Sequence, residues 1–214
     1  MLNSSPLLLI VSSPSGAGKT TLTTGLRKQL EGIRFSVSHT TRKPRVSEQH
    51  GREYYFTDRN HFEALIREDA FLEWAVVHDN LYGTSAKEID AASDCRCLLF
   101  DVDYQGARQI KSRQPGAVGV FILPPSMQTL ESRLRGRASE DEVTVQKRFK
   151  SARREIEHYG LFDYVIENDD LDTATDQLAS ILRAEECRRS RAAFRAENLL
   201  AQDRGFGGNL PPLR

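Results

Sequence analysis

The stretch Ser13-Pro14-Ser15-Gly16-Ala17-Gly18-Lys19-Thr20 decides the fold class of this chain. It follows the P-loop pattern G-x-x-x-x-G-K-[ST], with Ser13 at the first position, where the pattern has glycine. Small residues allow consecutive backbone N–H groups to turn inward around phosphate oxygens. The helix that follows points its positive N-terminus at the same anion. We therefore expect the residues from Ser12 to Thr20 to bind the phosphates of a nucleotide.

Two side chains at the end of this motif carry its chemistry. Lys19 supplies a mobile positive charge for the β- and γ-phosphates, and the Thr20 hydroxyl is a ligand for Mg²⁺. The apolar run Leu7–Val11 before the motif is typical of a buried strand, and leucines four residues apart follow it on one face of a helix over 20–30. The motif alone fits a GTPase, an ATPase or a small-molecule kinase.

Strand-like and helix-like segments alternate along the rest of the chain, which is typical of a parallel α/β sheet flanked by helices. Apolar or alternating runs predict strands over residues 34–39, 71–78, 97–100, 118–123 and 164–167. Helix-start patterns and helical periodicity predict helices near Asn60, Ser85, Ser126 and Ser139, and one long helix from Asp172 to about Ala201. These expectations describe a P-loop NTPase-type α/β fold.

Composition excludes several other classes of protein. The 214 residues fit one domain, with room for a small inserted lobe or lid. The chain has 30 Lys and Arg residues and 30 Asp and Glu residues. This balanced charge argues against a strongly basic nucleic-acid-binding protein. The longest apolar run is far shorter than the ~20 residues that span a membrane. Three cysteines, Cys95, Cys97 and Cys187, form no disulfide framework. We expect a cytoplasmic protein, monomeric or homo-oligomeric.

A second group of anion-binding side chains lies between residues 36 and 56. Arg42 and Arg45 are three residues apart, and Glu48 and Tyr54 follow them. An arginine guanidinium binds phosphate through two parallel hydrogen bonds, and a tyrosine hydroxyl can donate another. This mixture predicts a second phosphate site.

With these residues in view, the sequence from Leu7 to about Arg183 resembles the guanylate kinases, the family that phosphorylates GMP with ATP. The matching segments are, in chain order, Pro14–Lys19, Ser38–Arg45, Phe71–Ala75, Tyr82–Thr84, Asp101–Gly106, Phe121–Ser126, Arg133–Arg137 and Asn168–Asp170. The resemblance implies a kinase domain over 5–184, with a core over 5–35 and 88–184, a GMP-binding lobe over about 36–87 and a helical lid over about 135–148. We expect residues 185–202 to extend the last helix and residues 203–214 to form a disordered tail.

The resemblance also implies a role for individual side chains on the GMP side. Those that would hold the phosphate of GMP, or of dGMP, are Arg42, Arg45, Tyr54 and Tyr82, with Glu48 orienting the nearby arginine. Those that would read the guanine are Ser38, Glu73 and Thr84, with Asp103 supporting them.

On the ATP side, the resemblance places Asn168 near the adenine. The arginines that would clamp the transferring phosphoryl group are Arg133, Arg137 and Arg148. Asp101, at the end of a buried strand, would hold Mg²⁺ directly or through water. Arg135 is left as a surface residue.

The chemistry of guanine supports one of these roles independently. Guanine presents its N1–H and its exocyclic amine side by side, and one carboxylate such as Glu73 can accept both hydrogen bonds. Adenine would instead face that carboxylate with an acceptor, so such a site rejects adenine by about 10⁴-fold or more. The attacking group is a phosphate oxygen that is already ionised near pH 7, because the second pKa of a phosphate monoester is about 6. No general base is needed.

Two alternatives remain at this point. Guanylate-kinase-like interaction modules share the fold without catalysis, but they typically lack a working P-loop. A ribose bisphosphate kinase would not need a guanine-reading Glu73 with Ser38 and Thr84. Leu81, where a tyrosine is common in the family, and Ala138, where a glycine is common, depart from the family pattern without removing a proposed ligand.

Overall fold

The computed structural model describes residues 5–77, 79–136 and 142–205, and their strands form two sheets. The core strands are β1 (Leu7–Ser12), β2 (Ile33–Phe35), β7 (Cys97–Asp101), β8 (Val118–Leu123) and β9 (Tyr164–Glu167). The lobe strands are β3 (Ser38–Thr40), β4 (Tyr54–Phe56), β5 (Phe71–Val77) and β6 (Asn80–Ser85). The helices are α1 (Lys19–Gln29), α2 (Arg59–Arg67), α3 (Lys87–Asp90), α4 (Tyr104–Arg113), α5 (Met127–Arg135), α6 (Glu142–Ile156), α7 (Leu171–Glu186) and α8 (Arg189–Gly205), with a 3₁₀ turn η1 (Tyr159–Leu161).

The core sheet is parallel, in the order β2-β7-β1-β8-β9. β1 is the central strand, and its residue Val11 pairs with Asp101 of β7 while Ser12 pairs with Phe121 of β8. The chain fills the positions on one side of β1 before it crosses to β8 on the other side. Ligands of open parallel sheets bind at the carboxyl ends of the strands, where the strand order reverses in this way. The P-loop, which follows β1, lies at that point.

Alternation along β1 explains why helices cover both faces of the core sheet. Leu7, Leu9 and Val11 pack with buried residues of α1 and α7 on one face. Leu8 and Ile10 pack with buried residues of α4 and β7 on the other. Successive side chains of a strand point to opposite faces, so a continuous apolar run is buried on both sides. The prediction of a parallel sheet flanked by helices is confirmed.

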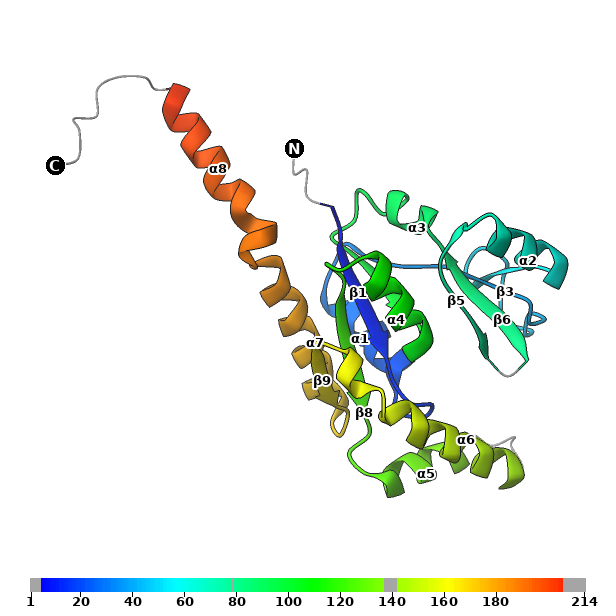
Figure 1. Cartoon of the computed structure of the whole chain (residues 1–214). Coiled ribbons are helices and arrows are strands. Elements are labelled where there is room, and N and C mark those ends of the chain that lie inside the picture. The colour runs from blue at the N-terminus through cyan, green and yellow to red at the C-terminus, as the bar shows by residue number, and fades with distance from the viewer. Residues whose placement is uncertain (1–4, 78, 137–141, 206–214) are drawn as a thin grey trace.

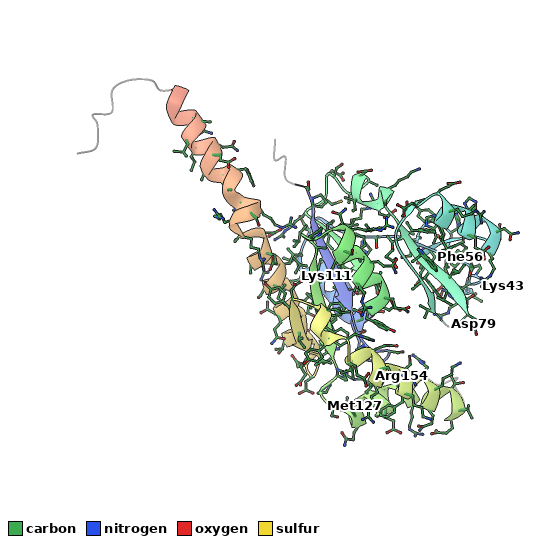
Figure 2. All side chains as sticks on the ribbon, viewed as in Figure 1. Lys43, Phe56, Asp79, Lys111, Met127 and Arg154 are labelled. Atoms are coloured by element: carbon green, nitrogen blue, oxygen red, sulfur yellow. The ribbon has the colours of Figure 1, made fainter. Side chains whose placement is uncertain are left out.

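Two smaller units flank the carboxyl ends of the core strands (Figure 1). One is the lobe sheet, in the order β4-β3-β6-β5, on which α2 packs by stacking Phe62 on Phe71 with ring centroids 4.5 Å apart. The other is the hairpin of α5 and α6, which has its own small buried cluster. Figure 2 labels Lys43, Phe56 and Asp79 in the lobe and Met127 and Arg154 in the hairpin, and shows the two units on different sides of the core.

The strand predicted over 34–39 is two short strands, because this segment crosses from one sheet to the other. Phe35 of β2 pairs with Leu99 in the core, whereas Ser38 of β3 pairs with Tyr54 in the lobe. Between them, the Val37 N–H donates to the buried Glu88 carboxylate at 3.2 Å. Short strands of two sheets therefore follow each other without the turn residues that would mark a boundary in the sequence.

Helix starts are confirmed in part. Ser126 caps α5 by accepting from the Thr129 N–H at 3.0 Å. Asp58, rather than Asn60, caps α2 by accepting from the His61 N–H, because its side chain reaches the free amides of the first turn. The short helix near Ser85 begins at Lys87. The capping residue Ser139 lies outside the described residues, although α6 is present. Sequence patterns did not indicate α4, β4 and β6.

The long helix predicted from Asp172 is two helices. The first of the two, α7, begins at Leu171, with Asp170 as its N-cap, and ends at Glu186. There the Arg188 N–H bonds to the carbonyl of Glu185, three residues back rather than four, and the buried Glu185 carboxylate accepts from Arg188 Nε at 2.8 Å. α8 then extends to Gly205, past the start of the predicted tail, and residues 206–214 are outside the described part. No helix within the described ranges is long and apolar enough to cross a membrane.

Candidate functional site

The P-loop joins β1 to α1 and depends on two glycines in the left-handed region. Gly16 has φ +96° and Gly18 has φ +94°. A Cβ on Gly18 would also lie 2.3 Å from Asn168 Nδ2, so this position excludes larger residues on two grounds. Among the described non-glycine residues, positive φ occurs at Asp69 and Asp79 and not at Ser13. Serine is therefore compatible with the backbone at the position where the motif has glycine.

Lys19, the first residue of α1, reaches the end of the neighbouring strand. Its Nζ forms an ion pair with the Asp101 carboxylate and donates to the Val102 carbonyl at 3.2 Å. The structure thus brings Lys19, which is predicted to bind phosphate, next to Asp101, which is predicted to hold Mg²⁺. The Asp101 side chain is 36% exposed. Its carboxylate and the Thr20 hydroxyl are the hard oxygen donors that suit Mg²⁺, which takes few protein ligands and completes its shell with phosphates and water.

The structure places Asn168 beneath the P-loop. Its side chain is buried and donates to the Ala17 carbonyl at 2.7 Å. Its backbone carbonyl accepts from Arg133 Nη2 at 3.1 Å. Asn168 therefore holds the loop backbone, and Arg133 lies beside it. Arg137, the other predicted clamp residue of this segment, lies outside the described residues.

One face of α6 contacts the P-loop through Ser15. Arg148 Nη2 donates to Ser15 Oγ at 2.6 Å, and the Ser15 N–H donates to Glu155 Oε2 at 3.1 Å. The other oxygen of Glu155 accepts from Ser151 Oγ at 3.0 Å. Sequence reasoning predicted Arg148 and missed Ser151 and Glu155. Their positions three and seven residues after Arg148 put them on the same helix face, which is the signal that could have found them.

The predicted second phosphate site is assembled around Arg42. Arg42 donates to both oxygens of Glu48, at 2.9 and 2.8 Å, and its Nε donates to the Tyr82 hydroxyl at 3.2 Å. The guanidinium also lies over the ring of Tyr54, 5.4 Å from its centroid. Arg45 contributes its backbone N–H to Glu48 at 2.8 Å, while its side chain is exposed. The hydrogen bonds from Arg42 lower the pKa of Glu48, so this carboxylate is ionised at neutral pH.

The predicted guanine-reading residues form a buried chain of hydrogen bonds. Glu73 is 4% exposed, and Thr84 Oγ1 donates to its Oε1 at 2.6 Å. Ser38 Oγ lies 2.9 Å from Thr84 Oγ1. Burial, with the nearby negative charge of Asp103 as a smaller cause, raises the pKa of Glu73 to about 7. Asp103 caps α4 by accepting from the N–H groups of Gln105 and Gly106. It therefore supports the site through α4 rather than through a free carboxylate.

A cavity of about 260 Å³ joins these groups. Its lining includes Lys19 and Asp101 from the P-loop side, Ser38, Tyr54, Glu73 and Tyr82 from the lobe, and Asp103. A larger hollow of about 510 Å³ lies at the junction of α7 and α8. Its Arg96 is paired with Glu186 and its Arg191 donates to the Gly116 carbonyl. The smaller cavity is the candidate active site, because residues predicted to bind phosphate and residues predicted to read guanine line it from two units.

Comparisons with known proteins agree with this geometry. The family model described as guanylate kinase matches residues 5–185. A guanylate kinase of Dechloromonas aromatica is 48% identical over 178 residues, covering 83% of this chain and 88% of that protein. One of Haemophilus ducreyi is 47% identical and covers 91% and 96%. The crystal structure of guanylate kinase from Anaplasma phagocytophilum superposes with a TM-score of 0.72 at 37% identity, covering 89% of this chain and 92% of that one. The chain belongs to the guanylate kinase family of enzymes.

Proposed function

We propose that this enzyme transfers the γ-phosphoryl group of ATP to GMP, and to dGMP, giving GDP or dGDP and ADP, within purine nucleotide metabolism and GMP recycling. The observation that carries the proposal is the cavity shared by Lys19 and Asp101 on one side and by Glu73 and Ser38 on the other. Lys19 and Asp101 have the charges to bind a nucleoside triphosphate with Mg²⁺, and Glu73 and Ser38 have the hydrogen-bonding groups to bind guanine. We place the reaction in the cytoplasm, in a monomer or homo-oligomer that needs neither nucleic acid nor a membrane.

On the acceptor side, ionised Glu73 would accept the two adjacent N–H bonds of guanine, and Ser38 and Thr84 would bond to its O6. The phosphate of GMP would bind Arg42, Arg45, Tyr54 and Tyr82. The first, third and fourth of these already meet in one cluster. A bound phosphate would be held by cations and hydroxyls, with its attacking oxygen free of any proton near pH 7.

On the donor side, the backbone of residues 12–20 would surround the ATP phosphates, and Lys19 would neutralise charge on the β- and γ-phosphates. Mg²⁺, held through Thr20 and Asp101, would supply further positive charge to the transferring group. Arg133, Arg137 and Arg148 would clamp the same phosphoryl group. Closure of the lobe over about 36–87 and of the lid over about 135–148 would exclude water, which would otherwise accept the phosphoryl group.

The proposal is tested by measuring ADP formation from ATP and Mg²⁺ with GMP, AMP, CMP, UMP or no acceptor. We expect turnover with GMP that exceeds turnover with AMP by about 10⁴-fold. A folded protein that binds ATP but is inactive with GMP would move the acceptor to a sugar phosphate, as in a ribose bisphosphate kinase. A protein that binds no ATP would be an interaction module, an alternative that the P-loop residue Lys19 and its partner Asp101 already disfavour.

Glu48 offers a separate test of the phosphate site. Glu48→Gln removes the charge that holds Arg42, so the guanidinium is no longer fixed toward Tyr54 and Tyr82. We expect the KM for GMP to rise about five- to tenfold, the equivalent of one net hydrogen bond, with the KM for ATP unchanged. Steady-state kinetics with each substrate varied in turn will measure both constants. Glu53→Gln, a neighbouring half-buried carboxylate paired with Arg52 instead, is the matched control. Equal effects of the two variants would contradict the assignment.

A further inference from the structure

The backbone of Trp74 in β5 is bonded by a side chain of the core. β5 is an edge strand of the lobe sheet, so the peptide groups on its outer side have no partner strand. Gln109 of α4 fills this place at Trp74. The Trp74 N–H donates to Gln109 Oε1 at 3.2 Å, and Gln109 Nε2 donates to the Trp74 carbonyl at 2.7 Å. The side-chain amide thus pairs with the strand as a neighbouring peptide would.

The residue before Trp74 is Glu73, the buried carboxylate of the candidate active site. Successive side chains of a strand point to opposite faces, and accordingly Glu73 is 4% exposed while Trp74 is 38% exposed. The pairing of β5 with β6 is irregular between Phe71 and Glu73. The hydrogen bonds to β6 alone therefore constrain this part of β5 weakly. The Gln109 clamp fixes the next peptide and with it the direction of the Glu73 side chain.

A second residue of α4 meets the Glu73 carboxylate directly. A Cβ built on Gly106 would lie 2.7 Å from Glu73 Oε2 and 3.0 Å from Val102 Cβ. The carboxylate is therefore seated between Thr84, which donates to Oε1, and the bare backbone of α4 at Gly106. Gly106 and Gln109 are three residues apart and lie on the same face of the helix. Helix α4 thus fixes the position of the Glu73 carboxylate through Gln109 and limits the space around it at Gly106.

We propose that Gln109 is a positioning residue for guanine recognition, holding the Trp74 peptide so that the Glu73 carboxylate meets the base, with Gly106 supplying the space for that carboxylate. The inference rests on the proposed function, because it concerns how the same site reads guanine. It assigns a role in specificity to a core residue that is not among those lining the candidate active-site cavity.

Gln109→Ala is expected to raise the Kd for GMP about tenfold, the equivalent of one net hydrogen bond of this kind. The Kd for ATP should stay within about twofold, because α4 does not form the P-loop. Trp74 is the sole tryptophan of the chain, so its emission during a GMP titration reports binding at the affected peptide. The preference for GMP over inosine monophosphate, which lacks the exocyclic amine, should fall, since both hydrogen bonds to Glu73 need the correct carboxylate direction.

Two variants on the same helix separate recognition from folding. Lys111→Ala (Lys111 is labelled in Figure 2) removes an ion pair with Asp163, away from the lobe, and should change the Kd for GMP less than twofold. Gly106→Ala replaces glycine by the best helix former, so the helix itself is favoured, but the new methyl group crowds Glu73. We expect Gly106→Ala to weaken GMP binding by at least tenfold and to weaken ATP binding less, because the methyl group lies closer to Glu73 than to Val102, whose carbonyl accepts from Lys19.

The outcomes are distinct. GMP-selective weakening in Gln109→Ala and Gly106→Ala, with loss of the preference over inosine monophosphate, supports the inference. A Kd for GMP in Gln109→Ala no different from that in Lys111→Ala overturns it. Equal weakening toward GMP, inosine monophosphate and ATP also overturns it, since a merely structural role predicts that pattern. If the unaltered protein binds ATP but shows no GMP-dependent turnover, the proposed function fails first and the inference fails with it.

Discussion

Replacing Glu73 by glutamine is expected to lower kcat/KM for GMP by about 10²–10³-fold, because two charge-assisted hydrogen bonds to guanine are lost. The amide of glutamine offers one acceptor and one donor, so at least one N–H of the base is left facing a donor. The shape of the site should survive the change. Thr84 Oγ1 can still donate to the side-chain oxygen, and glutamine has nearly the same shape and volume as glutamate.

The same substitution should make the protein more stable at pH 8. Burial raises the pKa of Glu73 to about 7, so the folded state holds this proton more tightly than the unfolded state does. Stability from this group is present at low pH and is lost as pH rises from about 4.5 through 7. Glutamine has no charge to bury, and we expect a gain of about 2–3 kcal/mol at pH 8 and little gain at pH 5. Thermal unfolding of both proteins at the two pH values measures this difference.

The pH dependence of catalysis supplies the control. Below pH 7 the unaltered enzyme should lose kcat/KM for GMP as Glu73 takes up a proton, in addition to the loss from the phosphate of GMP near pH 6. Glu73→Gln should show only the loss that comes from protonation of the GMP phosphate. Glu68→Gln, at an exposed carboxylate that ends α2, should behave as the unaltered enzyme does. Unchanged GMP turnover in Glu73→Gln would remove this residue from base recognition.

The predicted site residues that the structure brings together include those whose positions follow from local rules. The P-loop is contiguous, and its glycines are required by the backbone of the loop itself. Asp101 could be predicted near Lys19, because parallel strands end at the same edge of a sheet. Glu73 and Thr84 were identified through the family resemblance, and the structure then joined them by a hydrogen bond.

The groups that were missed act over long distances in the sequence. Gln109 bonds to Trp74, 35 residues away, and Glu155 bonds to Ser15, 140 residues away. Only the helical spacing of Glu155 from Arg148 could have indicated it, and nothing in the local pattern marks Gln109, because the partner of each is a backbone group that any residue carries. The division of the strand predicted over 34–39 into two was missed for a related reason, since the boundary between the two sheets is set by pairing partners and not by the residues of the segment.

Replacing Lys19 by methionine is expected to lower kcat by about 10³-fold, the effect of removing one preorganised positive charge from a transition state that gathers negative charge. Methionine keeps the length and apolar stem of lysine, so the start of α1 and the P-loop backbone should persist. The partner Asp101 is 36% exposed, so water can solvate its carboxylate when the ion pair is lost. We therefore expect the protein to stay folded, and a large loss of kcat would not come from unfolding. GMP binding, which depends on the lobe, should be nearly unchanged, whereas ATP binding should weaken.

Single-turnover rates at saturating ATP and GMP, compared with the Kd of each nucleotide, distinguish lost catalysis from lost binding. Lys28→Met, on the last turn of the same helix and exposed, is the matched control and should keep full activity. A loss of rate that disappears at saturating ATP would mean that Lys19 contributes only to binding of ATP in the ground state. A loss that persists at saturation would mean that the charge acts on the moving phosphoryl group. Because no general base is required when the acceptor oxygen is already ionised, a persistent loss would assign to that charge a large part of the catalysis that the P-loop side can provide.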